Sequence, residues 1–434
     1  MAEAPARAPD AVAPPPGNPR FPLVDSLRAL GFLMVFTVHA TGQAGIFKDP
    51  AGVPWYASYV TRLEVALPLF FAISAFLLYR PFVAGLVGAA RKPRIKSFAR
   101  ARALRIVPAF WVAMTLAAIY PGITGEWSEH WWAYYLFLQE YVPSWNVGSF
   151  QHTWHLSVEI TFYALLPFLV LLGARLARRK GTSRSAILLG QGTVVAGLYA
   201  LSLLARIVLT AVGYEAEVGT VPVSPREAYS ILLPGTLYTA LPATFDWIAL
   251  GMGLAITSVW LDGVRDQPKW VGVVRDHPAW AWGIAAFIWL MLVWLGPDYP
   301  EPYRTASFFT SEALYGVIAV LLLAPAVFGH TAGGAVRRFL AARPLAWLGL
   351  VSYGFFLWHL PILVKIGDTG AFELGGVPRT VEVWVAGFLL TLPCAAASYY
   401  LLERPLLRLK YRRRDGAASR GVEPAATQGL STER

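Results

Sequence analysis

The first long apolar segment of this 434-residue chain carries three ionisable residues, Asp25, Arg28 and His39. If the segment is helical, the step from Arg28 to His39 turns about 1100°, three full turns plus ~20°, and Asp25 falls within ~40° of the same line. All three therefore share one helix face, with Arg28 and His39 about 16 Å apart along the axis. A guanidinium can hold an anion and an imidazole can accept a proton. Each residue alone is better explained by packing or by reaching the interface, whereas the aligned set favours function.

A second set of polar residues lies in the fourth apolar segment. His155, Glu159 and Tyr163 recur every four residues and so share a helix face. A Glu beside a His can orient the ring and stabilise its charged form, which is the support that a general base needs. His155 lies near the expected water interface, where aromatic rings are common, so Glu159 is the stronger functional candidate.

A third set opens the third apolar segment, where Arg102 and Arg105 follow a basic loop directly. Together with Arg28 they form a cationic mouth suited to phosphate groups. The alternative is that these residues only determine topology, as we accept for most of the Lys and Arg in the loops.

Composition places these residues in a membrane protein. The chain is 56% hydrophobic and 15% charged, with 17 Trp and 19 Tyr, whereas soluble domains are about 25% charged. Aromatic residues of this kind suit helix ends at a bilayer interface. The net charge of +11 lies in alternate loops, so it indicates topology and no nucleic-acid partner.

A span needs about 20 mostly apolar residues, and this length filter predicts ten transmembrane helices. We expect them at Leu23–Gly42, Leu63–Val83, Leu104–Pro121, Leu156–Ala174, Ile187–Val212, Leu241–Leu261, Trp280–Gly296, Glu312–Phe328, Ala346–Lys365 and Val383–Leu402. The stretch Trp131–Leu138 is too short to span and is expected to be interfacial or re-entrant.

Loop charge predicts the orientation of these spans. The second, fourth and eighth connections and the C-terminal flank are basic, whereas the intervening loops are acidic or mixed. The positive-inside rule then places both termini in the cytoplasm of an all-α polytopic bundle in the cell membrane. Counting 1.5 Å per residue from the expected span ends predicts that one layer in the outer half of the membrane holds His39, Glu159, Asp246 and His359.

The two ends of the chain differ from the membrane domain between them. Residues 1–20 are rich in Ala and Pro and are expected to form a disordered cytoplasmic arm, and residues 411–434 a disordered basic tail. We expect one membrane domain at residues 21–410. The single cysteine, Cys394, excludes an intrachain disulfide and is better explained by packing than by reactivity.

Several segments, in order, resemble the bacterial membrane-bound acyltransferase family three, a family of integral-membrane O-acyltransferases. Val24–Ala40 is similar to the family's first helix, including its Arg-x10-His spacing at Arg28 and His39. Further similar segments are Phe70–Leu78 (with Ala75 where Gly is usual), Phe98–Trp111, Thr153–Pro167, Phe245–Gly251, Ser352–Pro361 and Tyr399–Leu407. The segment around Asp246 lacks the arginine of the family's Arg-x-Asp pattern.

The resemblance implies transfer of an acyl group, with acetyl the expected form, from cytoplasmic acyl-CoA to a hydroxyl of a carbohydrate, glycolipid or secondary metabolite. His39 would be the catalytic base, supported by Glu159. Substrate and donor binding would fall to Asp25, Arg28, Arg102, Arg105, Ser157, Tyr163, Asp246, Trp358 and His359. It implies no metal and no bound cofactor, and the partners are the donor, the acceptor and the lipid bilayer.

A transporter or flippase is the alternative, because ionisable residues buried in a helical bundle also form proton relays, here from His, Glu and Asp. The two halves of the chain show no convincing internal repeat and no pair of Gly/Pro-broken spans at matching positions. These features favour the enzyme. The sequence leaves the acceptor, the acyl chain and the oligomeric state open.

Overall fold

The computed structural model describes residues 21–46, 53–120, 130–139, 141, 151–179, 181–211, 241–295, 306–329, 334–370 and 378–408. Within these ranges the chain is helical and has no strand. The expected N-terminal arm and C-terminal tail lie outside them. The elements are α1 (Pro22–Gln43), α2 (Ala57–Thr61), η2 (Arg62–Val65), α3 (Ala66–Leu86), α4 (Ile95–Ile119), α5 (Trp131–Tyr135), η4 (Gln151–Thr153), α6 (Trp154–Arg178), α7 (Arg184–Ala211), α10 (Leu241–Leu261), α11 (Lys269–Asp276), α12 (Pro278–Leu295), α13 (Ala306–Phe328), α14 (Ala335–Leu340), α15 (Arg343–Thr369), α16 (Arg379–Ala397) and η5 (Ser398–Glu403).

The prediction of ten spans is confirmed. In the described ranges, ten helices are long and apolar enough to cross a membrane, and each overlaps one expected span. The stretch that was too short to span forms the five-residue α5. The sequence did not predict the short helices α11 and α14 or the π-helical turn η5, which continues α16.

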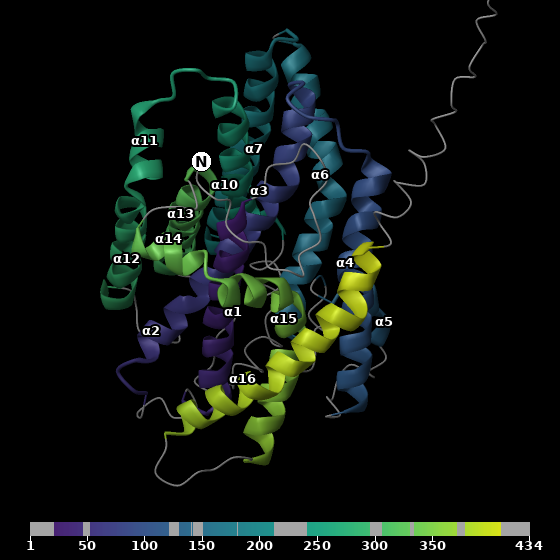
Figure 1. Cartoon of the computed structure of the whole chain (residues 1–434), viewed down its shortest axis with the longest axis vertical. Helices are drawn as coiled ribbons and strands as arrows, with labels where there is room; N and C mark the ends of the chain where they lie inside the picture. The colour runs from purple at the N-terminus through teal and green to yellow at the C-terminus, as the bar shows by residue number, and fades with distance from the viewer. Residues whose placement is uncertain are drawn as a thin grey trace, which may run out of the picture.

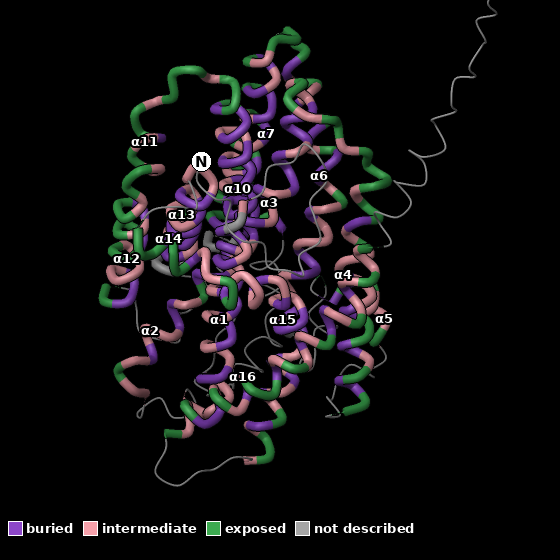
Figure 2. Tube along the Cα trace, in the orientation of Figure 1, coloured by how far each residue is buried: buried purple, intermediate pink, exposed green. Residues whose placement is uncertain are grey.

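The helices pack around α3 and α10, which are buried over most of their surface, whereas α12 lies at the edge of the bundle (Figure 1). Figure 2 shows the same gradient, with exposed residues along α11 and α12. The exposed positions of the outer helices are themselves apolar, for example Leu204 and Ile207 of α7 and Phe287 and Trp294 of α12. A bundle with apolar residues inside and outside is typical of a protein surrounded by lipid.

Helices α1 and α15 lie side by side along much of their length. Phe32 and Phe36 both contact the ring of Phe355. An added Cβ at Gly349 would lie 2.0 Å from the carbonyl oxygen of Asp25. Only glycine therefore allows the two backbones to approach this closely, and the contact holds the two helices in a definite register.

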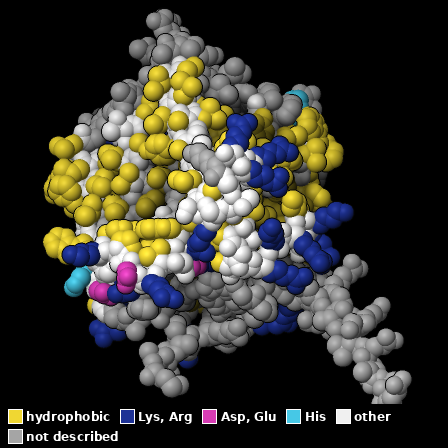
Figure 3. All heavy atoms as spheres, turned by 90° about the horizontal axis from the view of Figure 1, so that it is seen from above, with side chains coloured by type: hydrophobic (Ala, Val, Ile, Leu, Met, Phe, Trp, Pro, Cys, Tyr) yellow, Lys and Arg dark blue, Asp and Glu magenta, His cyan; other side chains and the backbone are white. Residues whose placement is uncertain are grey.

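The turns from α3 to α4 and from α6 to α7 lie at one end of the bundle, at the top of Figure 1. Figure 3 shows this end, where Lys and Arg side chains gather and acidic ones are sparse. The charge pattern expected from the sequence thus coincides with one end of the molecule. The side of the membrane that this end faces stays a prediction.

Candidate active site

A hydrogen bond between two histidine rings joins α1 to α15. The Nδ1 atom of His39 lies 2.8 Å from the Nε2 atom of His359. The ring planes are nearly parallel, with 12° between them and 5.1 Å between the centroids, as expected for rings that meet edge to edge through this bond. His359 is buried, whereas His39 keeps some accessible surface. His39 is therefore the member of the pair that a substrate can reach.

Two more histidines surround this pair, and we refer to His39, His152, His155 and His359 as the histidine cluster. The ring of His152, from η4, lies 5.0 Å from that of His359 and 6.4 Å from that of His39. The carbonyl oxygen of Phe356 lies 2.7 Å from Nδ1 of His359 and 3.1 Å from Nε2 of His152. His155, on α6, stands edge-on to the Phe356 ring, with 4.4 Å between the centroids. One residue of α15 thus contacts three of the four histidines.

The histidine cluster does not have the arrangement of a metal site. In the part of the chain that the structure describes, no group of three or more His, Cys, Asp or Glu could hold a metal ion. Burial, together with the neighbouring rings of His359, His39 and His155, lowers the pKa of His152 well below its usual value. His152 is therefore neutral at physiological pH and adds no charge next to His39.

A second group of polar residues begins one helical turn along α6 from His155. Glu159 accepts a hydrogen bond from the hydroxyl of Ser74 on α3, and Tyr163 lies within reach of both. The guanidinium of Arg102 lies over the Tyr163 ring, 6.0 Å from its centroid. The Nε atom of Arg102 is buried and has no hydrogen-bond partner among the described residues. The N–H group at this position can therefore donate a hydrogen bond to a ligand.

Arg28, Arg102 and Arg105 form what we call the arginine cluster. Arg28 and Arg102 lie within electrostatic range of each other, of Arg105 and of Glu159. Arg28 also pairs with Asp25 at 3.3 Å, but the carboxylate side chain is 43% exposed, so solvent screens this pair. Guanidinium groups this close repel one another, and an anion between them would relieve the repulsion.

Helix α6 connects the two clusters. His155 lies within electrostatic range of Glu159 on one side and of His39 on the other. Arg28, Glu159 and His39 are partly buried, and each keeps accessible surface. Polar side chains with accessible surface therefore run through the interior of the bundle from the arginine cluster to His39.

The structure gives His39 a different partner from the one expected. Its described hydrogen bond goes to His359, whereas Glu159 accepts from Ser74. Trp358 packs with an apolar cluster that includes Phe110. Ser157 is fully buried about 200° around α6 from Glu159, and its hydroxyl has no hydrogen-bond partner in the described ranges. The structure thus places Ser157 and Trp358 away from the hydrogen bonds of the site.

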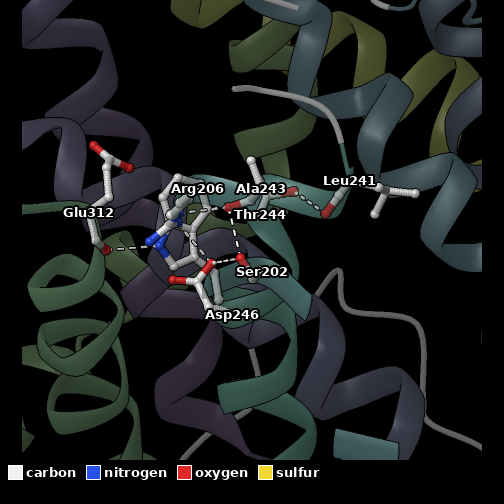
Figure 4. Close-up of polar contacts among 8 residues, drawn as sticks. Ser202, Arg206, Leu241, Ala243, Thr244, Asp246 and Glu312 are labelled. Atoms are coloured by element: carbon white, nitrogen blue, oxygen red, sulfur yellow. Dashed lines mark hydrogen bonds and ion pairs between the residues drawn. The ribbon is translucent and has the colours of Figure 1, made fainter. Parts of the chain in front are cut away.

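Asp246 does not join the histidine cluster directly but forms a buried ion pair with Arg206 of α7 (Figure 4). Its Oδ1 atom accepts hydrogen bonds from Nη2 of Arg206 at 2.9 Å and from the hydroxyl of Ser202 at 3.1 Å. The Arg206 guanidinium also lies over the Trp247 ring, which stacks on Phe71. Phe71 in turn contacts His155, so the Trp247–Phe71 ring pair links Arg206 to the histidine cluster.

Sequence analysis missed four contributors to this region: Ser74, His152, Arg206 and Phe356. Arg206 was detectable, because it is a charged residue inside an expected span. Ser74 was a polar residue within a quoted motif, and His152 lay just before another. Phe356 acts through its backbone carbonyl, for which the side-chain pattern contains no signal.

Known proteins resemble this chain over most of its length. The profile of the acyltransferase domain family matches residues 22–400. The YrhL protein of Bacillus subtilis is 22% identical over 407 residues, which cover 90% of this chain and 55% of the relative. The peptidoglycan O-acetyltransferase OatA of Listeria monocytogenes is 23% identical over 403 residues, covering 89% of this chain and 55% of the relative.

A shorter match joins the chain to the O-acetyltransferase OatA of Staphylococcus aureus, at 28% identity over 132 residues, which cover 30% of this chain and 20% of the relative. The chain spans about half the length of the first two relatives. No solved structure matches it significantly. Because the family profile covers most of the chain, this multi-pass membrane protein belongs to the membrane-bound acyltransferase family three.

Proposed function

We propose that the chain transfers an acyl group, acetyl in the expected case, from acyl-CoA to a hydroxyl, with His39 as the general base. His39 Nε2 takes the proton of the acceptor hydroxyl, whose oxygen attacks the thioester carbonyl carbon. The C–S bond then breaks, the CoA thiolate leaves, and the proton held by His39 passes to that sulfur. The products are an O-ester and CoA–SH, and His39 returns to its neutral form.

The observation that carries this proposal is the placement of Arg28 and His39 on one side of α1, each with accessible surface inside the bundle. The arginine cluster offers several guanidinium donors, including the buried Nε atom of Arg102, to the phosphates of CoA. A pantetheine arm is long and thin, so its thioester can reach His39, about 16 Å along the helix from Arg28.

The acceptor is proposed from the relatives. The Listeria relative is named for O-acetylation of peptidoglycan, and a glycan hydroxyl is the acceptor class that we favour for this chain. Family membership also favours acyl transfer over the transporter that the buried ionisable residues alone would allow.

The first experiment uses the full chain in nanodiscs with acetyl-CoA. CoA–SH release is followed with water and then with soluble peptidoglycan fragments as acceptors, and O-acetyl ester in the fragments is measured. In the His39→Ala variant we expect the rate of acetyl transfer to fall at least about 100-fold. Its size-exclusion profile and thermal midpoint should stay close to those of the parent. Turnover retained by a folded His39→Ala variant would remove the mechanism.

A second measurement tests the donor site. We expect Arg102→Gln to raise the KM for acetyl-CoA about tenfold with a much smaller change in kcat, because a phosphate contact present in both ground and transition states is lost. Arg100→Gln is the matched control, because Arg100 lies on the same helix and is exposed. Equal KM values for the two variants would contradict a phosphate site at the arginine cluster.

A further inference from the structure

The ring nitrogens of the histidine cluster constrain one another through a shared carbonyl oxygen. The oxygen of Phe356 lies 2.7 Å from Nδ1 of His359 and 3.1 Å from Nε2 of His152. A carbonyl oxygen can only accept hydrogen bonds, so both nitrogens carry a proton. The backbone of α15 therefore selects the tautomer of His359.

That selection extends to His39. In a neutral imidazole with Nδ1 protonated, Nε2 has a lone pair and accepts. Nε2 of His359 faces Nδ1 of His39 at 2.8 Å, so His39 must donate through Nδ1. Its own Nε2 atom is then the nitrogen left with a lone pair. The chain of two hydrogen bonds from Phe356 thus determines which nitrogen of His39 is basic.

We infer that His359 is the positioning residue of the base, holding His39 in the tautomer and ring orientation in which Nε2 accepts the acceptor's proton. This inference rests on the proposed function of His39. His359 occupies the place that a carboxylate takes in a Ser-His-Asp triad, and Glu159 does not compete for it, because Glu159 accepts from Ser74.

A neutral imidazole suits this position. His359 is almost completely buried in the span, where an ionised carboxylate would be costly. When Nε2 of His39 takes a proton, its Nδ1–H still donates to His359, and the positive charge is shared with a polarisable ring. Among the described residues, the other titratable groups facing His39 are His152 from η4 and His155 from α6. Neither is a carboxylate, and Glu159 lies beyond His155.

The test compares three substitutions at His359 in the full chain, with acetyl-CoA as donor and CoA–SH release as the readout. His359→Phe removes the acceptor for His39 Nδ1–H and keeps a planar ring. We expect its kcat to fall about 100-fold or more, with the KM for acetyl-CoA within about twofold of the parent. His359→Gln keeps an oxygen acceptor, and we expect it to restore at least about a tenth of the parental kcat.

His359→Glu supplies the readout that a purely structural role would not change. A carboxylate beside His39 stabilises its protonated, inactive form, so the acidic limb of the kcat/KM profile should shift to higher pH by about one unit. If His359→Phe is folded and keeps the parental kcat, or if His359→Gln and His359→Phe lose kcat equally and the Glu variant keeps the parental pH profile, the inference is overturned. A folded, active His39→Ala variant would instead overturn the proposed function, so the two failures are distinguishable.

Discussion

At the level of single residues, Asp246 shows how a buried charge finds its partner in this fold. The family pattern places an arginine two positions before the aspartate, where this chain has Thr244. The guanidinium comes instead from Arg206, which reaches the carboxylate from α7 (Figure 4). The pair is 5% and 1% exposed, so either charge alone would lie in a poorly solvated site.

Removing only the arginine should therefore be more damaging than removing both charges. We expect Arg206→Leu to lower the thermal midpoint of the purified protein strongly, at a cost of about 3 to 5 kcal/mol. Arg206→Leu combined with Asp246→Leu should recover most of the loss, and so should Arg206→Leu combined with Thr244→Arg, which returns the arginine to the position usual in the family. Arg178→Leu, at an exposed end of α6, is the control and should change little. A double Leu variant as unstable as Arg206→Leu would show that the two side chains are not coupled.

The candidate site shows which single-residue inferences a sequence supports. Helical spacing correctly identified polar residues that share a face of α1 and α6, because the 3.6-residue period depends only on local geometry. It did not identify His359 as the partner of His39, because 320 residues separate them and the period does not say which helices are neighbours. Glu159 was the expected partner of His39, but its carboxylate accepts a hydrogen bond from Ser74 instead.

At the level of helices, the register of α1 against α15 brings the two rings together. Asp25 meets Gly349, Phe36 meets Phe355, and His39 meets His359. The contacts follow the same order along both helices, so α1 and α15 run parallel in close contact. Small residues permit such an approach in membrane helices.

A side chain at Gly349 should disturb this register. Gly349→Ala would put a Cβ 2.0 Å from the Asp25 carbonyl oxygen, which is backbone and cannot rotate away. We expect a loss of about 1 to 3 kcal/mol in stability, together with a clear fall in the rate of acetyl-CoA consumption, because His39 moves relative to His359. Gly197→Ala is the matched control, because a Cβ at this α7 position meets nothing within 4 Å. If both variants keep the parental thermal midpoint and rate, the close contact does not hold the site.

The helices that sequence analysis found and missed differ in length. Ten spans were predicted because each carries about 20 apolar residues, a requirement of the bilayer itself. Helices α11 and α14 have only eight and six residues. Each carries charged side chains beside apolar ones, so the length filter passed over them. The π-helical turn Ser398–Glu403 packs against α4 and α15, and the hydrophobic pattern there is continuous.

At the level of the whole molecule, one end of the bundle is basic. Lys and Arg gather at the end that holds the α3–α4 and α6–α7 turns (Figures 1 and 3). Arg102 and Arg105 lie on α4 after the first of these turns, whereas His39 lies near the other end of α1. A donor that enters from the basic end would thus meet the arginine cluster before the histidine cluster.

This order of encounter makes a prediction about topology. Acyl-CoA is a soluble cytoplasmic donor, so the basic end must face the cytoplasm if the proposed reaction is to be supplied. The positive-inside rule requires the same orientation for an independent reason. Labelling of single cysteines with a membrane-impermeant maleimide can test it in a Cys394→Ala background, since Cys394 is the one native cysteine.

Thr182→Cys and Thr369→Cys form a matched pair, because both threonines are exposed, one in the α6–α7 turn and the other at the end of α15. In intact cells we expect Thr369→Cys to be labelled and Thr182→Cys to be protected until the membrane is permeabilised. The reverse pattern would place the arginine cluster on the outer side, away from any pool of acyl-CoA. The guanidinium groups would then need another anionic donor, although the hydrogen bonds from Phe356 through His359 to His39 would be unaffected. The labelling pattern therefore tests the donor separately from the base.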